Sequence, residues 1–138
     1  MPNIPTIRRF ARGDRLPVQA QRIWQILAAF VSSPLRKASD RKTMNYGELA
    51  LQMGYDTTQA GHMLGRQLGI IGRYCCLNDL PTLNSIVVNK TTGAPGDYVV
   101  TRDGFTWKQE QKLVHKQDWF ALGTPTPGTF RKVWEAGI

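Results

Sequence analysis

The residues best suited to contact a polyanion fall between positions 57 and 66. Threonine and glutamine side chains donate hydrogen bonds to phosphates or base edges, and an arginine pairs with phosphate or guanine. This stretch carries such groups at Thr57, Thr58, Gln59, His62 and Arg66. Two of these residues have a structural alternative. His62 could be a solvated surface histidine, and Arg66 an ordinary exposed cation.

A second set of cations lies near the start of the chain. The net charge is +8, and residues 1–42 hold nine Lys/Arg against two Asp, whereas residues 43–100 hold three basic and four acidic groups. Such a basic arm is typical of binding to nucleic-acid phosphates, and a solubilising surface is the alternative. The arginines of the arm are Arg8, Arg9, Arg12 and Arg15.

Catalytic chemistry has little support in the sequence. His115 has no carboxylate at helical spacing except Asp118, and no phosphate-binding glycine loop ends in Gly-Lys-Ser/Thr. The only cysteines, Cys75 and Cys76, are adjacent, so they make a poor disulfide and a poor metal site. We therefore expect no enzyme activity, no metal and no cofactor, and we interpret both cysteines as small apolar side chains on a helix.

The candidate contact residues must be positioned by a pair of short helices. Apolar periodicity predicts a helix over 18–32 that ends before Pro34. A capping box of Asn45 and Glu48 predicts a second helix over 45–53, which Gly54 would end. A third helix is expected from Asp56 or Thr57, with a break near residue 69 and continuation to residue 77. Two helices joined by a glycine turn form a helix-turn-helix arrangement.

The next segment predicts a β-hairpin that would serve as a wing. Residues 85–89 and 98–101 have strand character, and the tip between them carries Lys90, Thr91 and Thr92, which we expect to touch phosphate. A Lys-Thr-Thr-Gly tip is also a common solvated turn. A helix over 106–120 follows, and Phe130, Val133 and Trp134 predict a short last helix.

The chain is thus expected to be α+β and mostly helical, a winged helix-turn-helix with one β-hairpin, an N-terminal basic arm and a C-terminal helix. We divide it into an extended arm over 1–17, a winged-helix-like domain over 18–121 and an irregular tail with a short helix over 122–138. Glycines 61, 65 and 69 recur on one helical face. Their spacing indicates a surface that a neighbouring helix or a nucleic-acid backbone approaches closely.

Residues 43–96 resemble the C-terminal domain of the O6-alkylguanine-DNA alkyltransferases and the alkyltransferase-like proteins. The matching motifs are residues 44–50, Gly54, residues 60–65 and residues 80–88, in the family's order. The resemblance implies a winged helix that binds DNA. It also implies that Tyr46 contacts the target phosphate, as the tyrosine of this motif does in the family; the alternative for Tyr46 is an aromatic residue at the edge of the core.

The motif departs from the family at the residues that carry its chemistry. The nucleophile position corresponds to Thr82 when the motif is anchored on Pro81, and to Asn84 when it is anchored on Val87. Neither is a thiol, and alkyl transfer requires a cysteine thiolate. His62 stands where the family has the arginine that fills the gap left by a flipped base. We therefore expect plain duplex binding without alkyl transfer.

Two hypotheses about function follow. The first is a non-catalytic DNA-binding protein that uses the helix-turn-helix and the basic arm on duplex DNA. The second is a protein-interaction or regulatory module, or a homodimer, that uses the same surface. No run approaches the roughly 20 apolar residues that span a bilayer, and no hydrophobic region follows the first residues, so we expect no membrane partner and a cytoplasmic protein of bacterial or phage origin.

Overall fold

The computed structural model describes residues 14–37, 40–96 and 99–137 and is mainly helical, with one two-stranded sheet. The α-helices are α1 (Leu16–Ser32), α2 (Pro34–Lys37), α3 (Tyr46–Gln52), α4 (Gly65–Leu77), α5 (Trp107–Lys116) and α6 (Pro127–Glu135), and three 3₁₀ helices are η1 (Thr58–Leu64), η2 (Leu83–Ile86) and η3 (Trp119–Ala121). The strands are β1 (Met44–Asn45) and β2 (Val87–Val88). The α+β, mostly helical class expected from the sequence is therefore confirmed.

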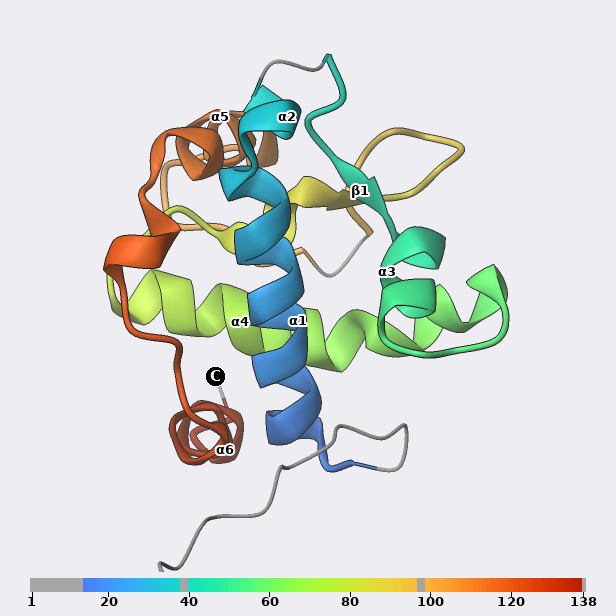
Figure 1. Cartoon of the computed structure of the whole chain (residues 1–138). Helices are drawn as coiled ribbons and strands as arrows, with labels where there is room; N and C mark the ends of the chain where they lie inside the picture. Colours follow the sequence, from blue (N-terminus) through green and yellow to red (C-terminus); the bar gives the residue numbers. More distant parts are fainter. Residues whose placement is uncertain (1–13, 38–39, 97–98, 138) are drawn as a thin grey trace, which may run out of the picture.

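The two longest helices, α1 and α4, cross at the centre of the molecule (Figure 1). α1 begins with Pro17 in its first turn, where a missing backbone N–H costs nothing. Its buried face carries Ile23, Trp24 and Leu27, and the buried Ile71 of α4 belongs to the same hydrophobic core. Burial of such side chains contributes about 1.5–3 kcal/mol each, so this crossing stabilises the fold.

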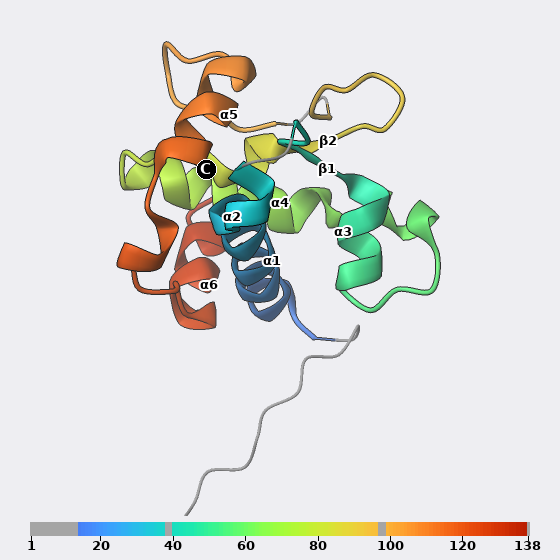
Figure 2. The same cartoon turned by 45° about the horizontal axis from the view of Figure 1, so that its top comes forward.

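The C-terminal segment belongs to the same core. α6 packs against both α1 and α4 (Figure 2). Its Phe130 is fully buried, 5.6 Å from the Tyr74 ring and 6.2 Å from the Trp24 ring, and Trp119 of η3 lies edge-on to Trp24 at 5.4 Å. Aromatic pairs at these separations stabilise beyond their buried area. Residues 122–126 are irregular, but the helix that follows them is anchored in the interior.

The two elements predicted to form a helix-turn-helix follow most of the expected local signals. Asn45 caps α3 by accepting a hydrogen bond from the Glu48 backbone N–H at 2.8 Å, and Glu48 returns a contact to the Asn45 N–H at 3.0 Å. Gly54 adopts φ +95°, a left-handed conformation that stops the helix. The second element differs in detail: it begins as the 3₁₀ helix η1 and becomes α-helical at Gly65, and it continues through Gly69 without the predicted break.

The predicted β-hairpin differs from the structure. β2 pairs in parallel with β1, with Met44 opposite Val87, and not with residues 98–101. Residues 99–101 have no strand conformation, and Tyr98 lies outside the described residues. The strand is short because Ile86 is the last residue of the 3₁₀ helix η2, so only Val87 and Val88 are extended. Their pairing partner is the segment before α3.

Two other boundaries are corrected. Leu16 and Pro17, assigned to the arm, form the first turn of α1, and of the arm itself only Asp14 and Arg15 precede the helix within the described residues. The helix predicted over 106–120 ends at Lys116, because the backbone of Gln117 is extended. In the described part of the chain, no helix has both the length and the apolar character needed to cross a membrane.

Candidate nucleic-acid interface

The structure brings most of the candidate contact residues together on the outer face of η1 and the start of α4. Thr57, Thr58, Gln59, His62 and Arg66 are all exposed. The Thr57 hydroxyl accepts a hydrogen bond from the Gln59 N–H at 3.2 Å, and the His62 ring Nδ1 contacts the Gln59 carbonyl. Thr57 therefore caps η1, which fixes the direction in which this face is presented.

Arg73 extends the same face, although the sequence analysis did not single it out. Positions 62, 66, 69 and 73 follow helical spacing, so His62, Arg66 and Arg73 lie in one row along η1 and α4. Neither the Arg66 nor the Arg73 side chain makes a hydrogen bond or ion pair with any residue that the structure describes. Spacing alone could have found Arg73, because it repeats the period that links His62 to Arg66.

The glycines of this segment divide into two kinds. A Cβ on Gly61 would lie 2.6 Å from the backbone carbonyl of Tyr46, and one on Gly47 would lie 2.7 Å from the Thr58 Cβ. These two glycines let α3 and η1 cross in close contact. A Cβ on Gly65 or Gly69 would meet nothing within 4 Å. The predicted close approach is therefore met by a neighbouring helix at Gly61, whereas the outer glycines leave space in front of the arginine row.

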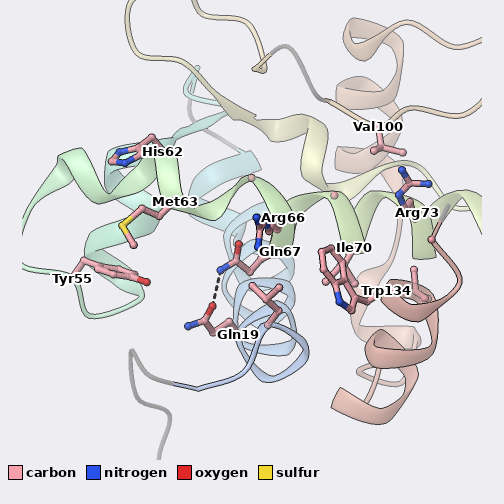
Figure 3. Close-up of a pocket in the computed structure, with 15 residues that line it drawn as sticks. Gln19, Tyr55, His62, Met63, Arg66, Gln67, Ile70, Arg73, Val100 and Trp134 are labelled. Atoms are coloured by element: carbon pink, nitrogen blue, oxygen red, sulfur yellow. Dashed lines mark hydrogen bonds between the residues drawn. The ribbon is translucent and has the colours of Figure 1, made fainter.

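A groove of about 1010 Å³ runs beside the arginine row (Figure 3). We call it the α4–α6 groove, because Arg66 and Arg73 of α4 form one side and Val133 and Trp134 of α6 form part of the other. Below it, the buried side chains of Gln67 and Gln19 are joined by a hydrogen bond of 2.6 Å. No carboxylate occurs among the described residues that line this groove, so its charge is positive.

A smaller hollow of about 340 Å³ lies next to Tyr46 and shares His62, Gly65 and Gly69 with the larger groove. The Tyr46 hydroxyl accepts a hydrogen bond from the Gly96 N–H at 2.8 Å, which ties the loop after β2 to α3. The Asn84 amide on the hollow's wall donates to the Val100 carbonyl at 3.2 Å. Tyr46 thus has a structural partner, while its ring still borders an open space.

The loop expected to be a wing tip is held by its own hydrogen bonds. The Asn89 side-chain oxygen accepts from the backbone N–H groups of Thr91 and Thr92 at 2.8 and 3.3 Å, and the Asn89 N–H donates to the Ala94 carbonyl at 2.8 Å. The Thr92 hydroxyl accepts from the Ala94 N–H at 3.2 Å. Lys90 and Thr92 are exposed at this tip.

The described part of the basic arm begins at the edge of the groove. Arg15 is exposed at the N-cap of α1, and the next residue, Leu16, lines the α4–α6 groove. Arg8, Arg9 and Arg12 lie outside the described residues. By covalent connection alone, Arg12 is tethered three residues from Arg15.

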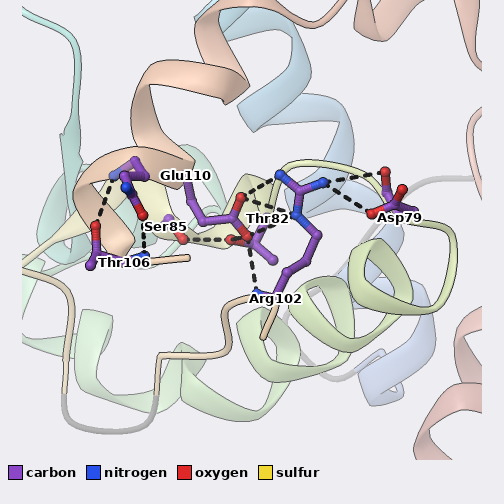
Figure 4. Close-up of polar contacts among 7 residues, drawn as sticks. Asp79, Thr82, Ser85, Arg102, Thr106 and Glu110 are labelled. Atoms are coloured by element: carbon purple, nitrogen blue, oxygen red, sulfur yellow. Dashed lines mark hydrogen bonds and ion pairs between the residues drawn. The ribbon is translucent and has the colours of Figure 1, made fainter. Parts of the chain in front are cut away.

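Both positions that the resemblance aligns with a nucleophile are buried. Thr82 has no exposed surface, and Asn84 is 5% exposed. The Thr82 hydroxyl lies 2.7 Å from the Ser85 hydroxyl and donates to Glu110 Oε2 at 2.8 Å (Figure 4). Thr82 is therefore part of an internal polar network and is not presented to a substrate.

Arg102 and Glu110 are the centre of that network, and sequence reasoning missed both. The Glu110 carboxylate has no exposed surface and accepts from Arg102 Nη2 at 2.8 Å and from the Arg102 backbone N–H at 3.1 Å. Arg102 also reaches Asp79 Oδ1 at 3.2 Å. The hydrogen bonds to Glu110 raise the pKa of the Arg102 guanidinium above its usual value. Helical spacing could have predicted that Glu110 is buried, because it lies four residues before the buried Val114 on the same helix face.

The thiols show no sign of activation. Burial raises the pKa of the Cys75 thiol to about 12, and burial also raises that of the half-buried Cys76. A nucleophilic thiol needs the opposite shift. Within the described ranges, no cluster of three or more His, Cys, Asp or Glu side chains is placed to hold a metal ion. The interpretation of both cysteines as buried side chains is confirmed for Cys75, whereas Cys76 is only partly buried.

No protein family, curated protein or solved structure matches this chain.

Proposed function

We propose that this protein is a non-catalytic DNA-binding protein that holds duplex DNA against the outer face of η1 and α4. The carrying observation is the row of His62, Arg66 and Arg73, whose two arginines have no partner among the described residues and stand beside glycines with open space in front of them. In this proposal α3 and η1 act as the helix-turn-helix, and the loop with Lys90 and Thr92 takes the place of a wing.

The spacing of the two arginines suits a nucleic-acid backbone. Seven residues of α-helix separate Arg66 from Arg73, which corresponds to about 10 Å along the axis. Along the axis of a duplex one strand advances about 3.4 Å per nucleotide, so the two cations are far enough apart to contact different phosphates. The open Gly65 and Gly69 would allow the backbone to come close between them.

The N-terminal arginines add positive charge that supports this proposal. Arg8, Arg9, Arg12 and Arg15 are joined to the body beside the groove, and each phosphate that they neutralise would release counterions from the DNA. Exposed Thr57, Thr58 and Gln59 would contribute hydrogen bonds to phosphates or base edges, as expected from the sequence.

Salt-dependent binding tests this proposal. Affinity of the full chain for a labelled duplex is measured by fluorescence anisotropy between about 50 and 200 mM salt. Arg66→Gln and Arg73→Gln should each reduce the slope of log affinity against log salt by about 0.9, and the four arm arginines replaced together by about 3–4. The control is Arg131→Gln on α6, whose side chain lies 3.9 Å from Glu135. Unchanged slopes in the Arg66 and Arg73 variants would refute the assignment of this face.

The same assay tests whether the resemblance to the alkyltransferase-like proteins extends to recognition of an alkylated base. A duplex that contains one O6-alkylguanine is compared with the unmodified duplex. Preference for the lesion would support a lesion-binding role related to the resembled family. Equal affinity would restrict the function to plain duplex binding.

A second candidate function is a protein-interaction module, and the character of the α4–α6 groove favours it. Met63 and Trp134 are 56% and 44% exposed and both line this groove. Exposed apolar side chains gathered in one hollow are typical of protein interfaces. Absence of any duplex binding at low salt, together with a dimer in sedimentation analysis, would support this candidate against the first.

A further inference from the structure

The α4–α6 groove is concave and large. Its volume of about 1010 Å³ is at the upper end of the range of small-ligand pockets, and it is enclosed by α4, α6, the first turn of α1 and Val100. Trp134 lies beside Ile70 at one end, and Tyr55 and Met63 lie at the other (Figure 3). A hollow bounded on several sides receives a narrow, flexible strand more easily than a rigid duplex.

Trp134 differs from the tryptophans of the core. Trp24 and Trp119 are 2% and 1% exposed and contact each other edge-on. Trp134 lines the groove with 44% of its surface exposed, although its neighbours on α6, Phe130 and Val133, are buried. An indole ring left open in a groove is a platform on which a planar ring can stack.

The cations of the groove complement this platform. Arg66 and Arg73 line it, no described residue gives either of them a partner, and the described lining holds no carboxylate. A positive groove with an aromatic platform is the arrangement by which proteins bind single strands: the cations follow the phosphates and the aromatic ring stacks on a base. Inside a duplex, base faces are covered by their neighbours, so stacking on Trp134 requires an unpaired base.

We infer that the α4–α6 groove binds a single nucleic-acid strand, with an unpaired base stacked on Trp134 and the phosphates held by Arg66 and Arg73. This inference rests on the proposed function and specifies the form of nucleic acid at this site: a single-stranded segment, either free or next to the duplex held by η1. Arg66 and Arg73 line this groove and are shared by the two modes. The modes differ in that Thr57, Thr58 and Gln59, which lie outside the described lining, contact only the duplex, whereas Trp134 contacts only the single strand.

The test compares a labelled thymidine oligonucleotide with a duplex of the same length, bound to the full chain in anisotropy titrations. Trp134→Ala should weaken binding of the single strand by about fivefold to a hundredfold and leave duplex binding nearly unchanged. Trp134→Phe, which keeps an aromatic face, should retain most of the affinity. Phe120→Ala is the matched control, because Phe120 is 70% exposed on η3, outside the groove lining.

A second readout does not depend on the alanine variant folding. Addition of the oligonucleotide should quench tryptophan emission in the wild type, and this quenching should be largely lost in Trp134→Phe. Persistence of the full quenching in Trp134→Phe would overturn the inference.

The remaining outcomes separate this inference from the proposed function. Duplex binding with no single-strand binding, or equal single-strand affinity of Trp134→Ala and Phe120→Ala, would overturn the inference and leave the proposed function standing. No binding of either nucleic acid at low salt would overturn both. A dimer that Trp134→Ala dissociates would assign the groove to a second copy of the chain and would also overturn the inference.

Discussion

The two sides of the η1–α4 segment carry the same residue types in opposite environments. On the inner side, Gly61 meets the Tyr46 backbone and Cys75 is buried, and outside this segment Arg102 is bound by Glu110 and Asp79. On the outer side, Gly69 faces open space, Cys76 is half-buried, and Arg73 has no partner among the described residues. Residue type alone therefore does not show which of these side chains maintain the fold and which are available to a ligand. Burial and bonding partners distinguish them.

Substitution of Arg102 and of Arg73 should give the largest difference in the free energy of unfolding. Arg102→Gln leaves the buried Glu110 carboxylate without its ion-pair partner, so the free energy of unfolding should fall by about 3–5 kcal/mol. Arg73→Gln should change it by less than about 0.5 kcal/mol. Urea denaturation measures both. An apolar double variant, Arg102→Met with Glu110→Leu, should recover much of the loss, because neither charge is then left unpaired. Equal losses in the Arg102 and Arg73 variants would remove the distinction.

Substitution of Gly61 and of Gly69 should change the stability by smaller amounts and in opposite directions. Gly61→Ala places a Cβ within 2.6 Å of backbone that cannot move aside, and should cost about 1–3 kcal/mol. Gly69→Ala in the helix interior should stabilise the protein by about 0.5–1 kcal/mol. Thermal melting followed by circular dichroism measures both. If a nucleic-acid backbone approaches Gly69, the same stabilised variant should bind DNA more weakly; unchanged binding would move the contact elsewhere on the face.

The third comparison is between the two thiols, Cys75 and Cys76. It concerns the rate at which each thiol is alkylated and not the stability of the protein. With a pKa of about 12, only about one Cys75 side chain in ten thousand is a thiolate at pH 8, and burial also blocks reagents. Iodoacetamide should therefore modify Cys76 first, as located by mass spectrometry. Comparable labelling of both thiols in the folded protein would contradict the assigned burial of Cys75.

The same thiol predicts a loss of stability at high pH. The folded state keeps the Cys75 proton up to about pH 12, whereas the unfolded chain releases it near the ordinary value of 9.0. The unfolded state therefore binds fewer protons in this window, so the free energy of unfolding falls as the pH rises from about 9 to 12. Replacing Cys75 with alanine should make this decline shallower.

Local signals in the sequence were sufficient for where the helices near the candidate interface begin and for the end of α3, but they wrongly predicted a break near residue 69. The Asn45 cap with Glu48, the left-handed Gly54 and the Thr57 cap each depend on atoms within a few residues, and each is present. The outer positions from 57 to 66 could be predicted for the same reason, because helical period alone decides which side chains share a face.

Features that depend on distant partners could not be predicted. The extended Val87 and Val88 pair with residues far upstream, and nothing in the run itself specifies that neighbour over the nearer residues 98–101. Glu110 was not singled out from the sequence, and its burial becomes understandable only once Arg102 and Thr82 are placed around it. The apolar residues of the last helix were recognised, yet the groove between α6 and α4 requires the packing of Phe130 to be known.

The pairing of Met44 with Val87 brings together the two ends of the segment that contains α3, η1 and α4. The segment that carries the proposed interface therefore begins and ends at neighbouring strands. The entropy of closing such a loop grows only with the logarithm of its length, and even doubling it costs about 0.6 kcal/mol. The turn at residues 53–57 is accordingly a position where inserted residues would leave the strand register intact, because α3 and η1 remain in contact through Gly47 and Gly61.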